Sequence, residues 1–423
     1  MQIEDTLVFI KSFIAAKRNF CRWKRREELA QWQETMIRHH LTKVLAKSAF
    51  FRGRIQADWR QTQFCTKRDM MGNFQRWNTE NVSLEAALAV AIAAESSRDF
   101  TQKLNGLTVG LSSGTTGAKG VFLASHKETV QWAGTVLARI LRGVPKKSRA
   151  ALFLRAGSNL YSATDSKFFE FRFFDAITPI ESQMESLNAF SPTILVAPPA
   201  LLKAIAQTGL KRPPQQLISV AYMLEDEDRK VIEAAFGVKC DEIYQATEGF
   251  LAATCPHGWL HWNEDVVVVE KEWLDKTHYH PIITDFHRLT QPIIRYRMDD
   301  IIIEKQGVCP CGSVFERIGK IVGRADEVLQ IPNKTTGNLT PVLPDFICRA
   351  VIRALPTQSE YRVVQTAPTH LAIHLSAPEN FANVCNEIAA MCETQGVVTP
   401  DMDVREYQYP EQTEKRRRVI RIK

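Results

Sequence analysis

Residues 112–120, Ser-Ser-Gly-Thr-Thr-Gly-Ala-Lys-Gly, combine the residue types that bind phosphate groups. The glycines leave the backbone free to curl, and successive backbone N–H groups in such a loop form a concave anion site. Four hydroxyls and the ammonium of Lys119 add further donors. The spacing of a Walker loop or of a dinucleotide fingerprint is absent. The pattern predicts a polyphosphate cradle, and a solvent-exposed Gly/Ser/Thr loop is the alternative.

Three later motifs carry groups suited to a nucleotide. Residues 244–248, Tyr-Gln-Ala-Thr-Glu, offer an aromatic face to adenine, a hydroxyl to phosphate and a carboxylate to Mg²⁺. Residues 292–300 end in Asp300, and a strand-end aspartate can accept both ribose hydroxyls. Residues 323–327 read Gly-Arg-Ala-Asp-Glu. Taken singly, these motifs also fit a helix cap, a solvated strand face and a turn.

The elements that must position these groups follow from the apolar pattern. The loop at 112–120 lies between two short apolar runs, which predict strands at 107–111 and 121–124. Further strands are expected at 151–154, 193–197 and 217–222, and helices at 83–98, 127–142, 199–208 and 226–236. This alternation predicts α/β layering with a largely parallel sheet. Short strands between 262 and 304 indicate a β-rich subdomain, at 266–269, 282–285, 293–296 and 301–303.

The chain divides into three expected regions. Residues 1–60 have a helical pattern, which fits a segment packed on the large domain better than a helix on a membrane surface. Residues 61–324 form the rest of an N-terminal α/β domain. Residues 325–423 restart as a small, mobile α+β domain, with strands at 361–366, 370–375 and 403–408 and a helix at 380–394.

Composition narrows the function class. The chain has 423 residues, a formal charge of +7 and ordinary apolar and charged fractions of 45% and 24%. It has no recognisable nucleic-acid module, and a small anionic substrate fits the mild positive charge. No apolar run is long enough to span a membrane, and residues 7–16 have the wrong flank for a signal peptide. An odd count of nine cysteines predicts reduced thiols in the cytoplasm.

In their fixed order, the four motifs resemble the core motifs of adenylate-forming enzymes, the acyl-CoA synthetase and adenylation-domain superfamily. The resemblance covers roughly residues 40–423. Within the superfamily the chain is similar to the branch of phenylacetate–CoA ligases and coenzyme F390 synthetase-like proteins. The chain length, Cys-Pro-Cys-Gly at 309–312 and Gly-x-Leu-His-x-x-Glu-Asp at 258–265 indicate this branch.

The resemblance implies a reaction and a set of residues. A carboxylate attacks the α-phosphorus of ATP, pyrophosphate leaves, and the acyl-adenylate passes its acyl group to a thiol. The implied catalytic residues are Thr247, Glu248 and Lys415, with Glu248 holding Mg²⁺. The implied ATP-binding residues are Ser112, Ser113, Gly114, Thr115, Thr116, Gly117, Lys119, Tyr244, Thr247, Asp300 and Arg324, and Asp326 is the implied hinge.

The substrates are less defined by the resemblance. It implies an aromatic or other small planar acid, in a pocket for which Tyr161, Ala197, Ala221 and Tyr222 are the candidate lining residues. The thiol acceptor is either CoA or the phosphopantetheine of a carrier protein. Glu414 replaces a family glycine before Lys415, and residues 331–338 replace a Gly-rich stretch that helps form the thiol tunnel. Transfer to an amine or another nucleophile and a degenerate nucleotide-binding protein therefore stay open. A homodimer is possible, and the sequence does not give the oligomeric state.

Cysteine and histidine residues form a second constellation, at Cys255, His257, His261, Cys309 and Cys311. A Cys-Pro-Cys turn brings two thiolates close, and structural zinc takes four N or S ligands in a tetrahedron. Spacing alone supports this site weakly, because a single Cys-x-Cys is not a zinc ribbon. Some relatives in the branch carry such a zinc. The resemblance thus implies a structural Zn²⁺ on Cys255, His261, Cys309 and Cys311, with His257 as a substitute ligand.

Overall fold

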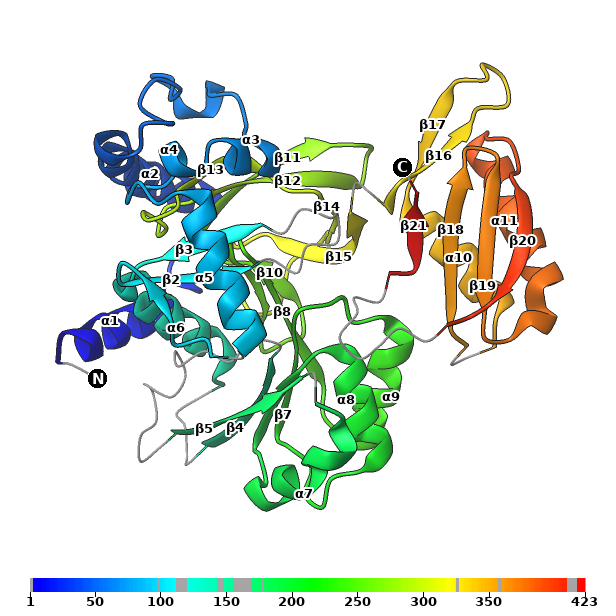
Figure 1. Cartoon of the computed structure of the whole chain (residues 1–423), viewed down its shortest axis with the longest axis horizontal. Helices are drawn as coiled ribbons and strands as arrows, with labels where there is room; N and C mark the ends of the chain where they lie inside the picture. The colour runs from blue at the N-terminus through cyan, green and yellow to red at the C-terminus, as the bar shows by residue number, and fades with distance from the viewer. Residues whose placement is uncertain are drawn as a thin grey trace. The chain divides into compact units, whose positions relative to one another are not determined.

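The computed structural model divides the chain into two units, each described here by itself (Figure 1). It describes residues 3–97, 99–111, 120–142, 148–154, 169–176, 178–324, 327–356, 359–408 and 417–422. The first unit holds residues 1–298 and 304–319, and the second holds 299–303 and 320–423. The predicted boundary at 324–325 lies a few residues beyond this division.

A five-stranded parallel sheet forms the centre of the first unit. Its strands run in the spatial order β5–β4–β6–β7–β8. Their bounds are β4 (Ser148–Leu154), β5 (Phe169–Asp175), β6 (Ile194–Ala197), β7 (Gln216–Ser219) and β8 (Cys240–Ala246). The inner strand β6 is continuously apolar and fully buried, as expected for a parallel strand with both faces covered, whereas β5 and β8 also carry charged residues. Mixed α/β layering is thus confirmed.

Alternate side chains of each strand enter different apolar clusters. Ala151 and Phe153 of β4 pack in a cluster with residues of α7 (Ile180–Phe190), α8 (Pro199–Thr208) and α9 (Asp226–Phe236). Ala150 and Leu152 pack in another cluster with residues of α6 (His126–Ile140). The helices at 199–208 and 226–236 match the predicted bounds, whereas β5 and α7 are not among the predicted elements.

Antiparallel strands extend this sheet beyond β8. The chain turns after β8 into β9 (Gly249–Thr254), and β10 (Leu260–Trp262) pairs with β9 and with the start of β15 (Arg317–Arg324). A further antiparallel group contains β11 (Val267–Trp273), β12 (His278–Asp285) and β13 (Ile293–Arg297). β14 spans Asp300–Glu304. The predicted β-rich region between 262 and 304 is confirmed.

The strands on either side of the candidate phosphate loop are not part of the parallel sheet. β2 (Leu107–Leu111) and β3 (Val121–Ala124) pair antiparallel with each other, and β1 (Lys103–Leu104) joins β2. They form a separate small sheet with β1, and the predicted parallel sheet is formed by β4 to β8. A parallel crossover needs a dozen or more residues, and the segment 112–120 is too short for one.

Helices dominate the N-terminal region, with α1 (Ile3–Asn19), α2 (Arg26–Lys47), η1 (Trp59–Gln61), α3 (Lys67–Gly72), α4 (Phe74–Trp77) and α5 (Leu84–Ser97). α1 packs along α6, as Figure 1 shows. A Cβ atom on Gly134 of α6 would lie 2.6 Å from the Phe9 carbonyl oxygen, so the close helix approach requires glycine. Among the described residues, no helix is long and apolar enough to cross a membrane.

The second unit is a small α+β domain with its own core. Its four-stranded sheet has the order β20–β19–β18–β21, with bounds β18 (Tyr361–Ala367), β19 (His370–Leu375), β20 (Asp401–Glu406) and β21 (Val419–Arg421). The core also contains residues of α10 (Pro344–Ala354) and α11 (Phe381–Gln395), and η4 (Pro378–Asn380) precedes α11. A separate hairpin joins β16 (Leu329–Pro332) to β17 (Leu339–Val342).

Candidate active site

The carboxyl ends of the parallel strands meet at one edge of the central sheet. Ala197 ends β6, Ala221 and Tyr222 follow β7, and Thr247 and Glu248 follow β8. Ala221 has a φ of 70°, an uncommon backbone conformation for a residue with a side chain. Ligands of open α/β sheets bind at this edge. The structure therefore places these predicted site residues on the edge where a substrate pocket is expected, and the predicted Tyr161 lies outside the described residues.

Thr247 and Glu248 form a two-residue turn between β8 and β9. Ala246 pairs with Gly249 across the turn, and the Thr247 hydroxyl donates to Glu248 Oε2 at 2.9 Å. Gly249 has a φ of +157°, and a Cβ atom there would lie 2.9 Å from Asp285 Oδ2. A glycine is required at this point because a buried carboxyl group approaches the backbone.

A loop after β12 contacts the backbone of this turn. Arg288 donates a hydrogen bond to the Thr247 carbonyl oxygen. Glu128 of α6 in turn accepts hydrogen bonds from the backbone N–H groups of Leu289 at 2.6 Å and Thr290 at 2.9 Å. Burial opposes ionisation of Glu128, but hydrogen bonds from Thr290 and Ser125 lower the pKa of its carboxyl group.

Sequence reasoning missed Glu128 and Arg288 as supports of the candidate site. Glu128 closes a capping box with Ser125, and the Ser-x-x-Glu spacing at 125–128 carries that signal in the sequence. The second role of Glu128, on a loop more than 150 residues later, has no local signal. Only the packing of α6 beside the loop brings the two segments together.

Asp285 lies beneath the same turn and is fully buried. Burial raises the pKa of Asp285 to about 7, and the nearby Arg288 guanidinium opposes the shift. Its Oδ1 atom accepts a hydrogen bond from the backbone N–H of His287 at 2.8 Å. The group therefore changes charge near neutral pH.

The remaining nucleotide motifs are spread over both units. Tyr244 of β8 lies 5.8 Å, ring to ring, from Trp262. Arg295 and Arg297 pair with Glu270 at 3.0 Å and Glu272 at 2.5 Å on β11, so both arginines bridge strands within the β-rich region. Of the predicted ribose ligands, Asp300 begins β14 and Arg324 ends β15, both in the second unit.

Several predicted residues lie outside the described part of the chain: Ser112, Ser113, Gly114, Thr115, Thr116, Gly117, Lys119, Asp326 and Lys415. The strands that flank the candidate phosphate loop are described. Leu111 pairs with Val121, so the two ends of the segment 112–120 are held side by side. A polar contact also joins β3 to the loop after β12, because Leu123 N donates to Gln291 Oε1 at 2.9 Å.

Cys255, His261, Cys309 and Cys311 come together as one cluster in the first unit. Their candidate ligand atoms all lie within 4.8 Å of one another, and the Sγ atoms of Cys255 and Cys309 are 3.6 Å apart. The cluster contains His261, whose Nε2 atom is 3.6 Å from Cys311 Sγ, and does not include His257. The thiol of Cys255 and the imidazole of His261 thus converge on the two thiols of the distant Cys-x-Cys turn.

The surroundings of His261 fix the orientation of its ring and keep the ring neutral, and both properties suit a metal ligand. The ring is fully buried, and Nδ1 lies 3.0 Å from the Phe315 carbonyl oxygen. Burial lowers the pKa of His261 to about 4, so the imidazole is neutral at physiological pH. Since Nδ1–H donates a hydrogen bond to the Phe315 carbonyl oxygen, Nε2 carries the lone pair, and this lone pair faces the thiols. Four soft or borderline donors with this support suit zinc.

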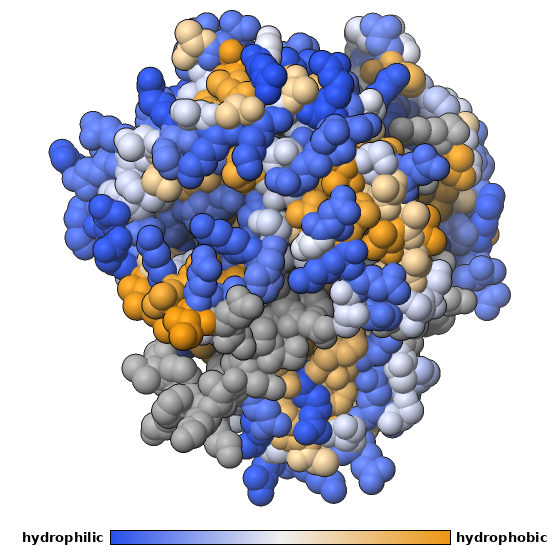
Figure 2. Space-filling model, turned by 60° about the vertical axis from the view of Figure 1, so that its left-hand side comes forward, coloured by the Kyte–Doolittle hydropathy of each residue, from blue (hydrophilic) through white to orange (hydrophobic). Residues whose placement is uncertain are grey.

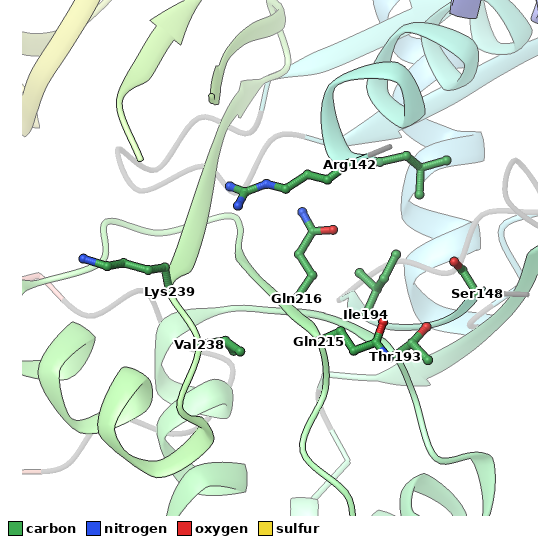
Figure 3. A pocket seen from close by; sticks show the side chains of 9 residues that line it. Arg142, Ser148, Thr193, Ile194, Gln215, Gln216, Val238 and Lys239 are labelled. Carbon is green, nitrogen blue, oxygen red and sulfur yellow. The ribbon is translucent and has the colours of Figure 1, made fainter. Parts of the chain in front are cut away.

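A cavity of about 390 Å³ lies at the opposite, amino edge of the parallel sheet (Figure 3). The residues that line it include Ser148, Ile194 and Gln216, which stand at or near the starts of β4, β6 and β7. Gln216 donates to Asp241 Oδ2 at 3.0 Å, and Arg142 pairs with the other oxygen of that carboxylate. These polar groups satisfy one another, and the cavity is distinct from the candidate site at the carboxyl edge.

Comparisons with known proteins agree on the fold. No protein-family model matches the chain. It is 24% identical over 210 residues to the phenylacetate–coenzyme A ligase of Thermus thermophilus, a match that covers 44% of each protein. The chain thus matches less than half the length of that curated relative.

Two solved structures resemble this chain over most of its length. A 2-hydroxyisobutyryl-CoA ligase in complex with 2-HIB-AMP has a TM-score of 0.62 at 15% identity, over 93% of this chain and 88% of that one. ATP-bound MatB from Rhodopseudomonas palustris has a TM-score of 0.52 at 14% identity, over 76% of this chain and 67% of that one. The expected fold, a large α/β domain with a small C-terminal domain, is therefore confirmed.

Proposed function

We propose that this chain, which has the fold of the adenylate-forming superfamily, is an ATP-dependent enzyme that activates a carboxylic acid. The acid, which we propose to be aromatic, attacks the α-phosphorus of ATP, and the products are an acyl-adenylate and pyrophosphate. The acyl group then passes to the thiol of CoA or of a carrier-protein phosphopantetheine. The observation that carries the proposal is the Thr247–Glu248 turn at the carboxyl edge of the central sheet.

The turn provides what the first step needs. A hydroxyl donor and a carboxylate stand together at its tip, and Arg288 and Gly249 fix the backbone that presents them. Phosphoryl-type transfer depends on alignment of the reacting groups and on neutralisation of the phosphate charge. A turn whose backbone is held in place provides the alignment. We assign Thr247 to the α-phosphate and Glu248 to the Mg²⁺ that accompanies ATP. That ion would neutralise phosphate charge.

The other assignments follow the motif order. Residues 112–120 hold the β- and γ-phosphates, Tyr244 stacks on adenine, and Asp300 and Arg324 bind the ribose. Lys415 approaches the carboxylate and the α-phosphate, and Asp326 acts as the hinge. The acid pocket is built from the segments after β4, β6 and β7, including Tyr161, Ala197, Ala221 and Tyr222.

The segment implied in the thiol step is where this sequence departs from the pattern of the family it resembles. The differing stretch at 331–338 covers the end of β16 and the loop of the β16–β17 hairpin. The Asn333 side chain closes this loop by accepting from the backbone of Thr335 at 2.9 Å. Asn333 also pairs with Val397 just beyond α11, and the Lys334 ammonium pairs with Glu393. Because this stretch differs in sequence from the Gly-rich stretch that helps form the thiol tunnel in the family the chain resembles, carrier-protein phosphopantetheine and amines belong in the tests beside CoA.

ATP–pyrophosphate exchange tests the first half-reaction. With Mg²⁺ and a panel of aryl acids, we expect exchange with at least one acid and none with a Glu248→Gln variant of unchanged melting temperature. Absence of exchange with every acid would contradict the proposal. Mass spectrometry of products formed with CoA, a loaded carrier protein and amines then identifies the acceptor.

We also propose that Cys255, His261, Cys309 and Cys311 bind a structural zinc ion. The fit rests on four converging N and S donors with a hydrogen-bonded imidazole. The ion would join the end of β9, strand β10 and the turn at 309–311, which are distant in sequence.

Metal analysis of the purified protein tests this site. We expect one zinc per chain, and its loss with a lower melting temperature in Cys309→Ser. Cys240→Ser is the matched control, because Cys240 is also buried but lies outside the cluster. Equal zinc contents in the two variants would contradict the assignment.

A further inference from the structure

The N-terminal helix α1 exposes a continuous apolar stripe. Ile3, Leu7, Ile10 and Ile14 are 83%, 63%, 46% and 57% exposed, although each is a large hydrophobic side chain. Their spacings of four, three and four residues place them in one row along the helix. This is the spacing of the d and a positions in a short antiparallel or parallel helix pair. A monomer gains nothing from four aligned apolar side chains in water.

The stripe is not the side of α1 that packs on its own molecule. Phe9 and Phe13 pack against the cluster that includes α6 and the central sheet. The His126 ring bonds Asp5 at 2.9 Å, and Lys17 donates to the Leu141 carbonyl oxygen. α1 is therefore a preformed helix with one face held and the other in solvent. Figure 2 brings this side of the molecule forward and shows apolar side chains gathered on its surface.

We infer that α1 pairs antiparallel with α1 of a second copy of this chain. In one register, Ile3 lies opposite Ile14 of the second copy, and Leu7 lies opposite Ile10. The same register repeats both contacts across a two-fold axis, so each side chain of the stripe meets another side chain of the stripe. Such a patch is self-complementary, as an isologous dimer contact requires.

The charges on the exposed face fit the same register. Glu4 and Lys11 occupy successive e positions beside the stripe, and both side chains are exposed. Among the described residues, neither has an ion pair within its own molecule. In the antiparallel register Glu4 lies beside Lys11 of the second copy, and Lys11 lies beside Glu4 of that copy. Two symmetric ion pairs thus flank the apolar layers.

This pattern favours a second copy over a membrane surface. A helix that lies on an anionic membrane carries a basic polar face. The exposed face of α1 does carry basic residues, among them Lys11 and Arg18, which would suit an anionic surface. Glu4 stands beside the apolar stripe, between Ile3 and Leu7 in the sequence, and its charge disfavours such a surface. In the helix pair this acid has an assigned partner of opposite charge.

The contact should be reversible. Each helix contributes only four apolar side chains. Their contact buries less area than the roughly 800 Å² per partner of a standard interface. The helices are already folded on their own molecules, so pairing carries little ordering cost. We expect a dissociation constant on the order of micromolar.

Sedimentation velocity from about 1 to 100 µM tests the pairing. We expect a monomer–dimer equilibrium in the full-length protein, weakened about tenfold by Lys11→Glu, which makes both ion pairs repulsive. The double variant Glu4→Lys/Lys11→Glu should recover the wild-type constant, because it restores both pairs with their signs exchanged. Ile10→Gln should abolish the dimer, and Ile92→Gln, at an exposed position of α5, is the control.

Three outcomes would overturn the inference. One is a monomer at every concentration, and another is a dimer that Ile10→Gln leaves unchanged. The third is a double variant as weak as the single one. Co-sedimentation with vesicles of phosphatidylserine and phosphatidylcholine is measured in parallel. Binding of a monomer that is lost in Ile10→Gln would assign the stripe to a membrane instead. Circular dichroism checks that each surface variant is folded.

Discussion

Individual carboxyl groups of this molecule differ sharply in their surroundings. Glu248 shares a hydrogen bond with Thr247 in a half-buried turn, whereas Asp285 lies fully buried beneath the same turn. Glu128 is half-buried, and hydrogen bonds from Thr290 and Ser125 lower the pKa of its carboxyl group and so keep it ionised. Residue type alone therefore does not identify which acid handles a ligand and which one supports the backbone.

Substitution of Asp285 should change how stability depends on pH. The pKa of Asp285 rises from 3.8 in the unfolded chain to about 7 in the folded one. Between these values the folded protein binds the extra proton, so its stability falls as pH rises. Asp285→Asn should remove this slope and stabilise the protein at pH 8 by about 2–4 kcal/mol. Urea unfolding at pH 5.5 and pH 8 measures both effects.

Asp275→Asn is the control for this prediction. Hydrogen bonds from Thr277 and His278 outweigh burial and lower the pKa of Asp275 to about 2. Its stabilising effect is present above the unfolded pKa and is lost only as pH falls through the folded value. Its substitution should leave the slope between pH 5.5 and pH 8 intact. A slope that persists in Asp285→Asn would contradict the role given to Asp285.

Lys415 is the residue on which the adenylation step should depend most. If its ammonium aligns the carboxylate and the α-phosphate, Lys415→Ala should slow ATP–pyrophosphate exchange by about 10²–10³-fold. Arg416→Ala removes a neighbouring charge and should change the rate by less than about threefold. Comparable losses in the two variants would show that the basic run acts through its net charge rather than through one aligned group.

At the scale of elements, a short acidic segment after β10 holds the N-terminal helices. Glu264 is buried and accepts from Arg26 of α2 at 2.8 Å, while Gln33 of α2 donates to the Glu264 carbonyl oxygen at 2.7 Å. The next residue, Asp265, pairs with the buried Arg139 of α6 at 2.5 Å. The Glu-Asp pair at 264–265, part of the branch-like motif at 258–265, thus joins α2, α6 and the sheet.

Glu264→Gln should loosen this junction. The substitution leaves Arg26 without its carboxylate partner and should lower the free energy of unfolding by about 1–3 kcal/mol. The loss is below that of a fully buried pair because the Arg26 side chain is 43% exposed. Chemical denaturation measures it. Glu28→Gln is the control, because Glu28 lies on the same helix in an exposed pair with Arg25, and it should leave the denaturation midpoint unchanged. An equal shift of the midpoint in both variants would contradict the prediction.

At the scale of the whole molecule, the nucleotide motifs are shared between two units with separate cores. Asp300 and Arg324 belong to the second unit, and Tyr244, Thr247 and Glu248 belong to the first. In the proposed reaction, the part of the second unit that follows Asp326 moves between the adenylation and thiol-transfer steps about a hinge at that residue. Relative motion of two such units is the ordinary expectation for separately packed domains.

Restriction of the hinge should separate the two half-reactions. Asp326→Pro fixes φ near −65° and removes a backbone donor, so it limits rotation without altering the ATP ligands. We expect pyrophosphate exchange within about threefold of wild type and a loss of about tenfold or more in thioester formation. Asp326→Ala, which leaves the backbone free, should retain both activities. Parallel losses in both steps would place the effect in folding rather than in the hinge.

Local patterns in the sequence determined many of the elements and their order, although β5 and α7 were not predicted. Apolar runs and caps predicted the helices at 199–208 and 226–236 and the strands beside the loop at 112–120, because these signals arise within a few residues. The ordered motifs likewise predicted the adenylate-forming fold. Cys-x-Cys spacing and the resemblance together predicted which four residues form the metal-type cluster.

Only the tertiary structure decided which distant segments meet. It paired β2 with β3 outside the parallel sheet, placed Glu128 and Arg288 behind the Thr247–Glu248 turn, and buried Asp285 enough to raise its pKa. Strand pairing and burial depend on packing between residues far apart in the chain, and no local pattern encodes them. The reactive residue types of the candidate site can therefore be identified from the sequence, whereas the contacts that hold them in place depend on long-range packing.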